Sequence, residues 1–265
     1  DIQALTTGQL AGLTTTTVKA LSTDQVVALS SFQVANLTTA TLATLTTDQV
    51  QAIETADIAS LKTAQLAGLA TATLVALTTD QIQALTTTQL AGISTAAVNA
   101  LTTDQVVALT TTQVAGLTTS TIASLSTRNV AVLTTDQIGV ISTAGLAALK
   151  TSQVAALSTD AIVALSTFQV ANLTTATMAA LTTTQVQSIE TTDIQALTTR
   201  QLGSLATSTI TALSTDQVVA LSTFQVANLS TATLRALTTD QVQSIETADI
   251  QALTTGQLAG LTTTT

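Results

Sequence analysis

The stretch LTTDQVVA at Leu101–Ala108 decides the fold, because it is one copy of an eight-residue unit that fills the chain. At every eighth residue from Leu5 to Leu261 stands Leu or Ile, with no insertion or deletion. If that residue is position one, position six is also aliphatic, position three is Thr except at Ser31, and position eight is nearly always small. The consensus is L-[TS]-T-x-Q-[VIL]-x-A. Self-similarity at a fixed period is the signature of a repeat architecture.

A longer period is superimposed on the octads. Octads with Phe begin at Leu29, Leu165 and Leu221, and octads with Glu follow each of them three octads later. From Leu157 to the end the pattern repeats every seven octads, and Asp1–Thr17 is identical to Asp249–Thr265. We therefore expect residues 1–265 to form a single continuous octapeptide-repeat solenoid, cut from a longer array.

One uninterrupted α-helix does not fit this period. Eight residues at about 100° each leave a drift of about 80° per octad, so positions one and six would not stay on one face. A helix broken once per octad fits better, with the Thr at position three as its N-cap. On this interpretation the structural N-caps include Thr23, Thr103 and Thr215. In octads with Thr or Ser at position two, the Gln three residues later could add a capping box.

Such short helices are stable only when they are stacked, because an isolated helix below about 12–15 residues is marginal in water. The fold class we predict is therefore an all-α solenoid of Thr-capped mini-helices, one per octad, with positions one and six in a continuous core. The alternative is a β-solenoid, since Thr, Val and Ile favour strands. Sparse Gly, no Pro and the helix-forming Ala, Gln and Leu argue against it.

Composition excludes several chemistries. The chain has no His, Cys or Pro and carries a net charge of −9 with six basic residues. Without His or Cys there is no triad, thiol nucleophile, zinc site or disulfide, so we expect no enzyme, no metal, no cofactor and no small-molecule substrate. Nucleic-acid binding needs a clustered basic face, which six scattered residues do not make. No apolar run approaches the ~20 residues of a membrane span.

Few side chains qualify as functional candidates. Phe32, Phe168 and Phe224 stand at the variable fourth position, outside the predicted core, and could make chain–chain contacts. Asn36, Asn172 and Asn228 close the same octads and are expected to end their helices. The pairs Glu54–Asp57, Glu190–Asp193 and Glu246–Asp249 are interpreted as structural, because acid–base chemistry needs a cleft with two unlike environments.

Two resemblances bear on function. LTTDQVVAL at Leu101–Leu109 resembles the opening helix of a transcription-activator-like effector repeat, but the 34-residue period, base-reading loop and basic stripe of that family are missing. The whole Thr/Ala-rich, Cys-free, acidic array resembles repeat regions of very large secreted bacterial surface and matrix proteins. That resemblance implies an adhesin-like stalk or matrix filament outside the cell or on its surface.

The function we predict is therefore that of an extracellular structural scaffold, stalk or matrix filament that self-associates. Its six basic residues and single Met leave few sites for trypsin-like proteases and for oxidation, which suits long-lived material. One alternative is a protein- or peptide-binding α-solenoid. Another is an ice-binding Thr array, which is disfavoured because position three is assigned to capping and position two alternates among Thr, Glu, Lys and Ala.

Overall fold

The computed structural model describes residues 2–261 and is all-helical there, with no strand and one short helix per octad. This confirms the predicted class, a helical repeat solenoid, and the β-solenoid alternative is wrong. The chain divides into two compact units, unit 1 (Asp1–Leu133) and unit 2 (Thr134–Thr265).

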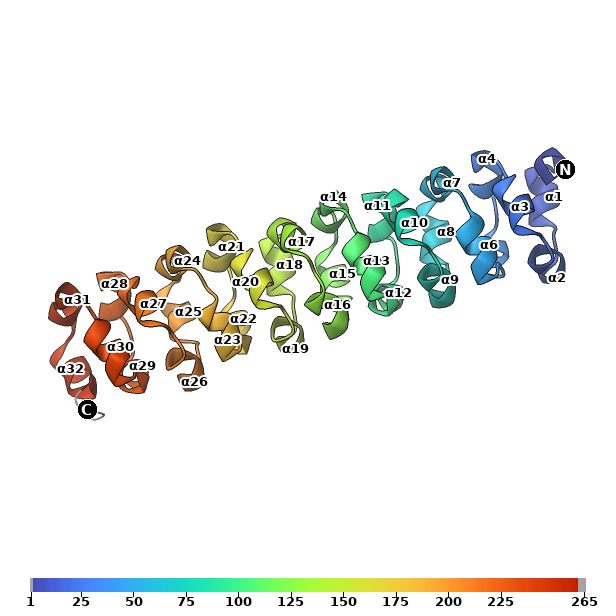
Figure 1. Cartoon of the computed structure of the whole chain (residues 1–265). Helices are drawn as coiled ribbons and strands as arrows, with labels where there is room; N and C mark the ends of the chain where they lie inside the picture. The colour runs from blue at the N-terminus through green and yellow to red at the C-terminus, as the bar shows by residue number, and fades with distance from the viewer. Residues whose placement is uncertain (1, 262–265) are drawn as a thin grey trace. The chain divides into compact units, whose positions relative to one another are not determined.

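Unit 1 holds one 3₁₀ turn and sixteen α-helices (Figure 1). In chain order they are η1 (Ile2–Ala4), α1 (Thr7–Ala11), α2 (Thr15–Lys19), α3 (Thr23–Val27), α4 (Ser31–Val34), α5 (Thr39–Leu42), α6 (Thr47–Ala52), α7 (Thr55–Ser60), α8 (Thr63–Ala67), α9 (Thr71–Val75), α10 (Thr79–Ala84), α11 (Thr87–Ala91), α12 (Thr95–Ala100), α13 (Thr103–Ala108), α14 (Thr111–Ala115), α15 (Thr119–Ser124) and α16 (Thr127–Ala131).

Unit 2 continues the pattern over its described residues. Its helices are α17 (Thr135–Val140), α18 (Thr143–Ala147), α19 (Thr151–Val154), α20 (Thr159–Val163), α21 (Thr167–Ala171), α22 (Thr175–Ala180), α23 (Thr183–Gln187), α24 (Thr191–Ala196), α25 (Thr199–Leu202), α26 (Thr207–Ile210), α27 (Thr215–Val219), α28 (Thr223–Ala227), α29 (Thr231–Ala236), α30 (Thr239–Ser244), α31 (Thr247–Ala252) and α32 (Thr255–Leu261).

Each helix begins one residue earlier than the sequence predicts. Thr23, Thr103 and Thr215 are not N-caps but the first helical residues, and the caps are Ser22, Thr102 and Ser214. These caps have extended backbone, with φ near −71° and ψ near 160° in Thr102, and each hydroxyl accepts a hydrogen bond from the Gln N–H three residues on. The Gln side chain in turn accepts from the cap N–H, so the predicted capping box is confirmed in these octads.

The link between helices is as regular as the helices. The N–H of position one donates to the carbonyl of position six, as from Leu109 to Val106 at 3.2 Å, and closes the last turn. Leu109 and Thr110 are then extended before the next helix begins. Among the described residues none has positive φ, which explains why the repeat does without a fixed Gly.

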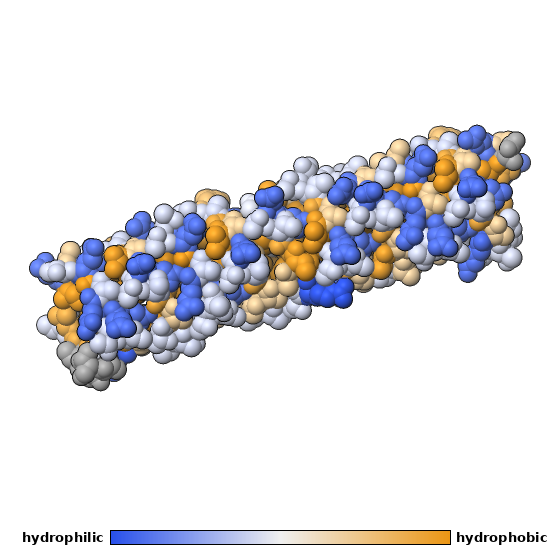
Figure 2. All heavy atoms as spheres, viewed as in Figure 1, coloured by the Kyte–Doolittle hydropathy of each residue, from blue (hydrophilic) through white to orange (hydrophobic). Residues whose placement is uncertain are grey.

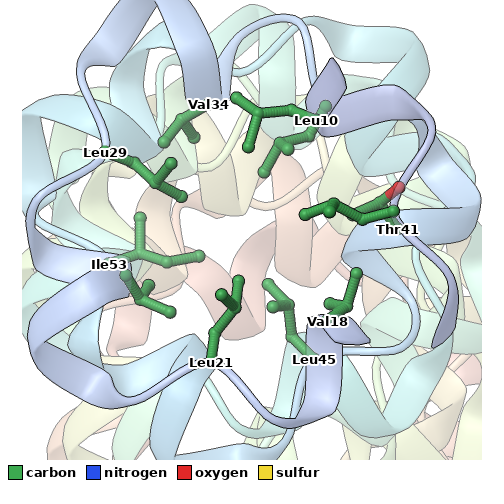
Figure 3. A pocket seen from close by; sticks show the side chains of 11 residues that line it. Leu10, Val18, Leu21, Leu29, Val34, Thr41, Leu45 and Ile53 are labelled. Carbon is green, nitrogen blue, oxygen red and sulfur yellow. The ribbon is translucent and has the colours of Figure 1, made fainter. Parts of the chain in front are cut away.

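Positions one and six form the core, as predicted. Val106 and Ile138 are fully buried, and the position-one residue Leu109 is 5% exposed. Figure 3 shows such side chains in unit 1 pointing toward one another, among them Leu10 and Val34 from helices and Leu29 from a link between helices. They leave a cavity of about 10 Å³, at the lower limit for one water molecule. The core of these first coils of unit 1 is therefore closely packed.

Gln at position five joins successive coils of the superhelix. Gln81 Nε2 donates to the carbonyls of Val50 (2.8 Å) and Ile53 (2.7 Å), which lie 31 and 28 residues earlier. The same two separations recur for Gln49, Gln113, Gln185, Gln217 and Gln241. Helices also contact the helix three octads away, as α10 contacts α7 and α13. One coil is therefore about three and a half octads, from the separation of 28 residues.

At three places in unit 1 the Thr of position three packs against the next coil. A side chain added at Gly116 would begin 2.9 Å from Cγ2 of Thr87, which lies one coil earlier. The Thr39–Gly68 and Thr63–Gly92 pairs are closer still. In these three pairs the contact leaves room for only a small residue at position eight, and it gives the Thr a packing role in place of the predicted capping role.

Asn129 provides a test of the inter-coil bonds. Its side chain is fully buried and Nδ2 donates to Leu101 O at 3.0 Å, but Oδ1 has no partner, because Asn is one methylene too short to reach the cap N–H as well. Asn129→Gln should stabilise unit 1 by about 1–2 kcal/mol by satisfying that oxygen and the cap N–H. Urea unfolding of both forms measures this, with the exposed Asn99→Gln as control. A lower stability would contradict the assigned role of position five.

Candidate functional site

The side chains that stand out from the repeat are the three phenylalanines. Phe32, Phe168 and Phe224 are 72%, 70% and 71% exposed, on α4, α21 and α28 respectively. Their predicted position outside the core is therefore confirmed, while their contact role stays a prediction. Burying such a ring in an interface would remove substantial apolar area from water, since Phe is one of the larger contributors to contact energetics. No other large hydrophobic residue is as exposed in the described part of the chain.

An Asn side chain hydrogen-bonds to the backbone carbonyl of each Phe near the end of its helix. Nδ2 of Asn36, Asn172 and Asn228 donates to the carbonyl of the Phe four residues earlier, at 2.8 Å in all three octads. Asn172 and Asn228 are the C-cap residues of α21 and α28, as predicted. In the first copy α4 ends earlier, with Ala35 as its C-cap, so Asn36 lies one residue beyond the helix end.

The Glu octads pack directly on the Phe octads. Helix α4 contacts α7, α21 contacts α24, and α28 contacts α31, so each Phe helix has a Glu-capped helix in the next coil. Glu54, Glu190 and Glu246 occupy the N-cap position but make no side-chain cap hydrogen bond, and all three are exposed. Their carboxylates are therefore open to solvent beside the Phe helices.

The second carboxylate of each pair behaves differently. Asp57, Asp193 and Asp249 are each 3% exposed, because they occupy position five, where other octads have the inter-coil Gln. Ser31 Oγ, in the single octad that lacks Thr at position three, donates to Asp57 Oδ1 at 2.5 Å. The pairs thus combine one exposed and one buried carboxylate. Among the described residues no group of three or more His, Cys, Asp or Glu is placed to hold a metal ion.

Small grooves open where position five is Thr. Thr41, Thr73 and Thr233 each line one, and the volumes are about 130–140 Å³. The shorter Thr side chain does not fill the space that Gln fills elsewhere. Typical small-molecule sites measure about 300–1,000 Å³, so these grooves are too small for a drug-sized ligand.

The visible surface has no broad hydrophobic area. In Figure 2 the visible face is mostly near-neutral in hydropathy, with scattered hydrophilic residues and small hydrophobic spots rather than one broad apolar area. No helix within residues 2–261 is long and apolar enough to cross a bilayer.

Sequence reasoning located the Phe side chains but missed two features of the site. It did not place Gln between coils, and it did not bring the Glu octads against the Phe octads. The sequence did show that each Glu octad follows a Phe octad by three octads. That spacing predicts a contact only when the length of one coil is known.

A family model described as ALTTAQ repeat matches residues 2–39, 50–87, 87–119, 138–175 and 186–223, together more than half of the chain. The letters of that description follow position eight and then positions one to five of the octad, as in ALTTDQ at Ala76–Gln81. No curated protein matches the chain. The match is to a repeat family and not to a known enzyme family.

Proposed function

The chain belongs to the ALTTAQ repeat family, and from this premise and the geometry above we propose that it is a non-enzymatic structural scaffold outside the cell or on its surface. The observation that carries the proposal is the inter-coil Gln. The most frequent polar residue of the core, as at Gln81 and Gln113, is used to join the chain to itself and faces no ligand cavity.

The proposal extends to how the scaffold is built. The octad period passes Leu133 and Thr134 without a break, which supports one continuous solenoid running through both units. The absence of Cys and the single Met suit material exposed to oxidants, and the six basic residues offer few sites to trypsin-like proteases. An extended scaffold of this kind would suit a stalk, a matrix component or the shaft of an adhesin-like protein.

We further propose that copies associate through Phe32, Phe168 and Phe224. These three side chains are 70–72% exposed, and they are the only aromatic residues in the sequence, which has no Trp or Tyr. The ice-binding alternative loses support from the coil length. Because a coil is not a whole number of octads, equivalent Thr residues of adjacent coils do not fall into straight ranks.

Small-angle X-ray scattering tests the scaffold. Coils of about 28 residues stacked at about 9 Å, the usual helix–helix distance, would make a rod about 85 Å long with a radius of gyration near 26 Å. A compact chain of this length would give about 18 Å. A value near 18 Å in dilute solution would contradict the continuous solenoid, whatever the chain does at high concentration.

A further inference from the structure

In unit 2 the exposed Phe and Glu side chains gather on one edge. We call the aromatic–acidic edge the set Phe168, Glu190, Phe224 and Glu246. Their helices α21, α24, α28 and α31 lie along the same edge of the unit in Figure 1. The two copies are 56 residues apart, twice the 28-residue separation that defines a coil, which is why they fall on one side.

Of the three basic side chains of the same unit, Arg200 belongs to α25, whereas Lys150 and Arg235 lie away from the aromatic–acidic edge. Lys150 precedes α19 and Arg235 belongs to α29, and in Figure 1 these helices follow the opposite edge of unit 2. Both side chains are exposed. The Arg235 side chain lies along α32, with Cγ 3.6 Å from the point where a side chain at Gly260 would begin. We call Lys150 and Arg235 the basic edge. None of α21, α24, α28 and α31 carries a Lys or Arg.

This separation of charge restricts how two copies can meet. If the aromatic–acidic edges of two copies faced each other, Glu190 and Glu246 of one would approach those of the other, and like charges in an interface are costly. The basic edge instead offers opposite charge to the Glu side chains, and a guanidinium or ammonium group can stack on an exposed Phe ring.

We propose that the aromatic–acidic edge of one copy packs against the basic edge of a second copy. The inference rests on the self-association proposed above and specifies its contact. Because the two edges are different surfaces on opposite sides of the unit, each bound copy leaves one of each free. Such a heterologous contact does not close on itself, so association continues to open-ended sheets or bundles and does not stop at a dimer.

Charge reversal with sedimentation velocity tests this contact. At 0.15 M salt the full chain should gain mass with concentration, and Glu190→Lys with Glu246→Lys should weaken association at least tenfold. Lys150→Glu with Arg235→Glu should weaken it similarly. The chain carrying all four substitutions should regain association, because the two edges are again opposite in charge. Phe168→Ala with Phe224→Ala should also weaken it without lowering the melting temperature, since both rings are exposed.

The control is Asp160→Lys with Asp216→Lys, at exposed positions on α20 and α27. It changes the net charge from −9 to −5, as Glu190→Lys with Glu246→Lys does, and so relieves general repulsion equally. A loss of association in the Glu pair but not in the control supports the contact. Equal loss in both, or no recovery in the four-substitution chain, overturns it while self-association stands. A wild type that stays monomeric at all concentrations overturns both, and the scattering test of the rod is unaffected.

Discussion

Ile162→Ala should lower the free energy of unfolding of unit 2 by about 3 kcal/mol, because it empties part of a core that has no second layer to close over it. Ile162 is 2% exposed and stands in α20 at position six of its octad. The same core runs through the coils of unit 2, and a short helix has no stability of its own to compensate. Urea unfolding followed by circular dichroism measures the loss, and hydrogen exchange shows which helices open.

The neighbouring residue is the matched control. Val163 belongs to the same helix but is 42% exposed at position seven, so Val163→Ala should change stability by less than about 0.5 kcal/mol. If both variants were equally destabilised, helix propensity rather than core packing would be responsible. The assignment of position six to the core would then be wrong.

Gln81→Ala should destabilise unit 1 by about 2 kcal/mol, mainly through hydrogen bonds to the preceding coil. The variant loses the bonds to Val50 O and Ile53 O and leaves the Thr78 N–H without its acceptor at 2.9 Å. Ala is sterically acceptable at this position, since Ala97 and Ala161 occupy it in other octads and their helices form. The loss therefore reports hydrogen bonding and not a failure to fold.

Gln83→Ala serves as the control, in the same helix α10 but exposed at position seven. It should be close to neutral. Amide exchange in the two variants separates the effects, because only Gln81→Ala should increase exchange at the junction between α10 and the coil that contains Val50 and Ile53. If amide exchange at this junction were unchanged in Gln81→Ala, the assignment of Gln81 to an inter-coil contact would be wrong.

The helical octad and its core were predictable because they depend on local periodicity. Positions one and six share a helical face only if the helix breaks once per octad, and that condition can be worked out from residue spacing. The exposure of the Phe residues followed directly from the same register. The capping position was one residue off, because the nearly constant Thr at position three looked like the cap, whereas caps vary and include Glu54, Lys62 and Ala70.

The inter-coil features could not be predicted from one octad. A bond from Gln81 to Ile53 depends on how far one turn of the superhelix advances the chain, which is a sum of many small bends. The same holds for Thr87 under Gly116 and for the Glu helices beside the Phe helices. The Thr at position three therefore makes a contact between coils, as Thr87 does, although its regular spacing looked like that of a helix cap.

The half-integral coil also determines which insertions of octads keep the surface pattern aligned. Adding one octad would turn everything beyond it by about a hundred degrees around the superhelix, since eight of about 28 residues are inserted. Adding seven octads completes two coils and returns each downstream side chain to its original side. Unequal crossing-over in blocks of seven octads, the spacing of Phe168 and Phe224, therefore lengthens the array while keeping its surface pattern aligned.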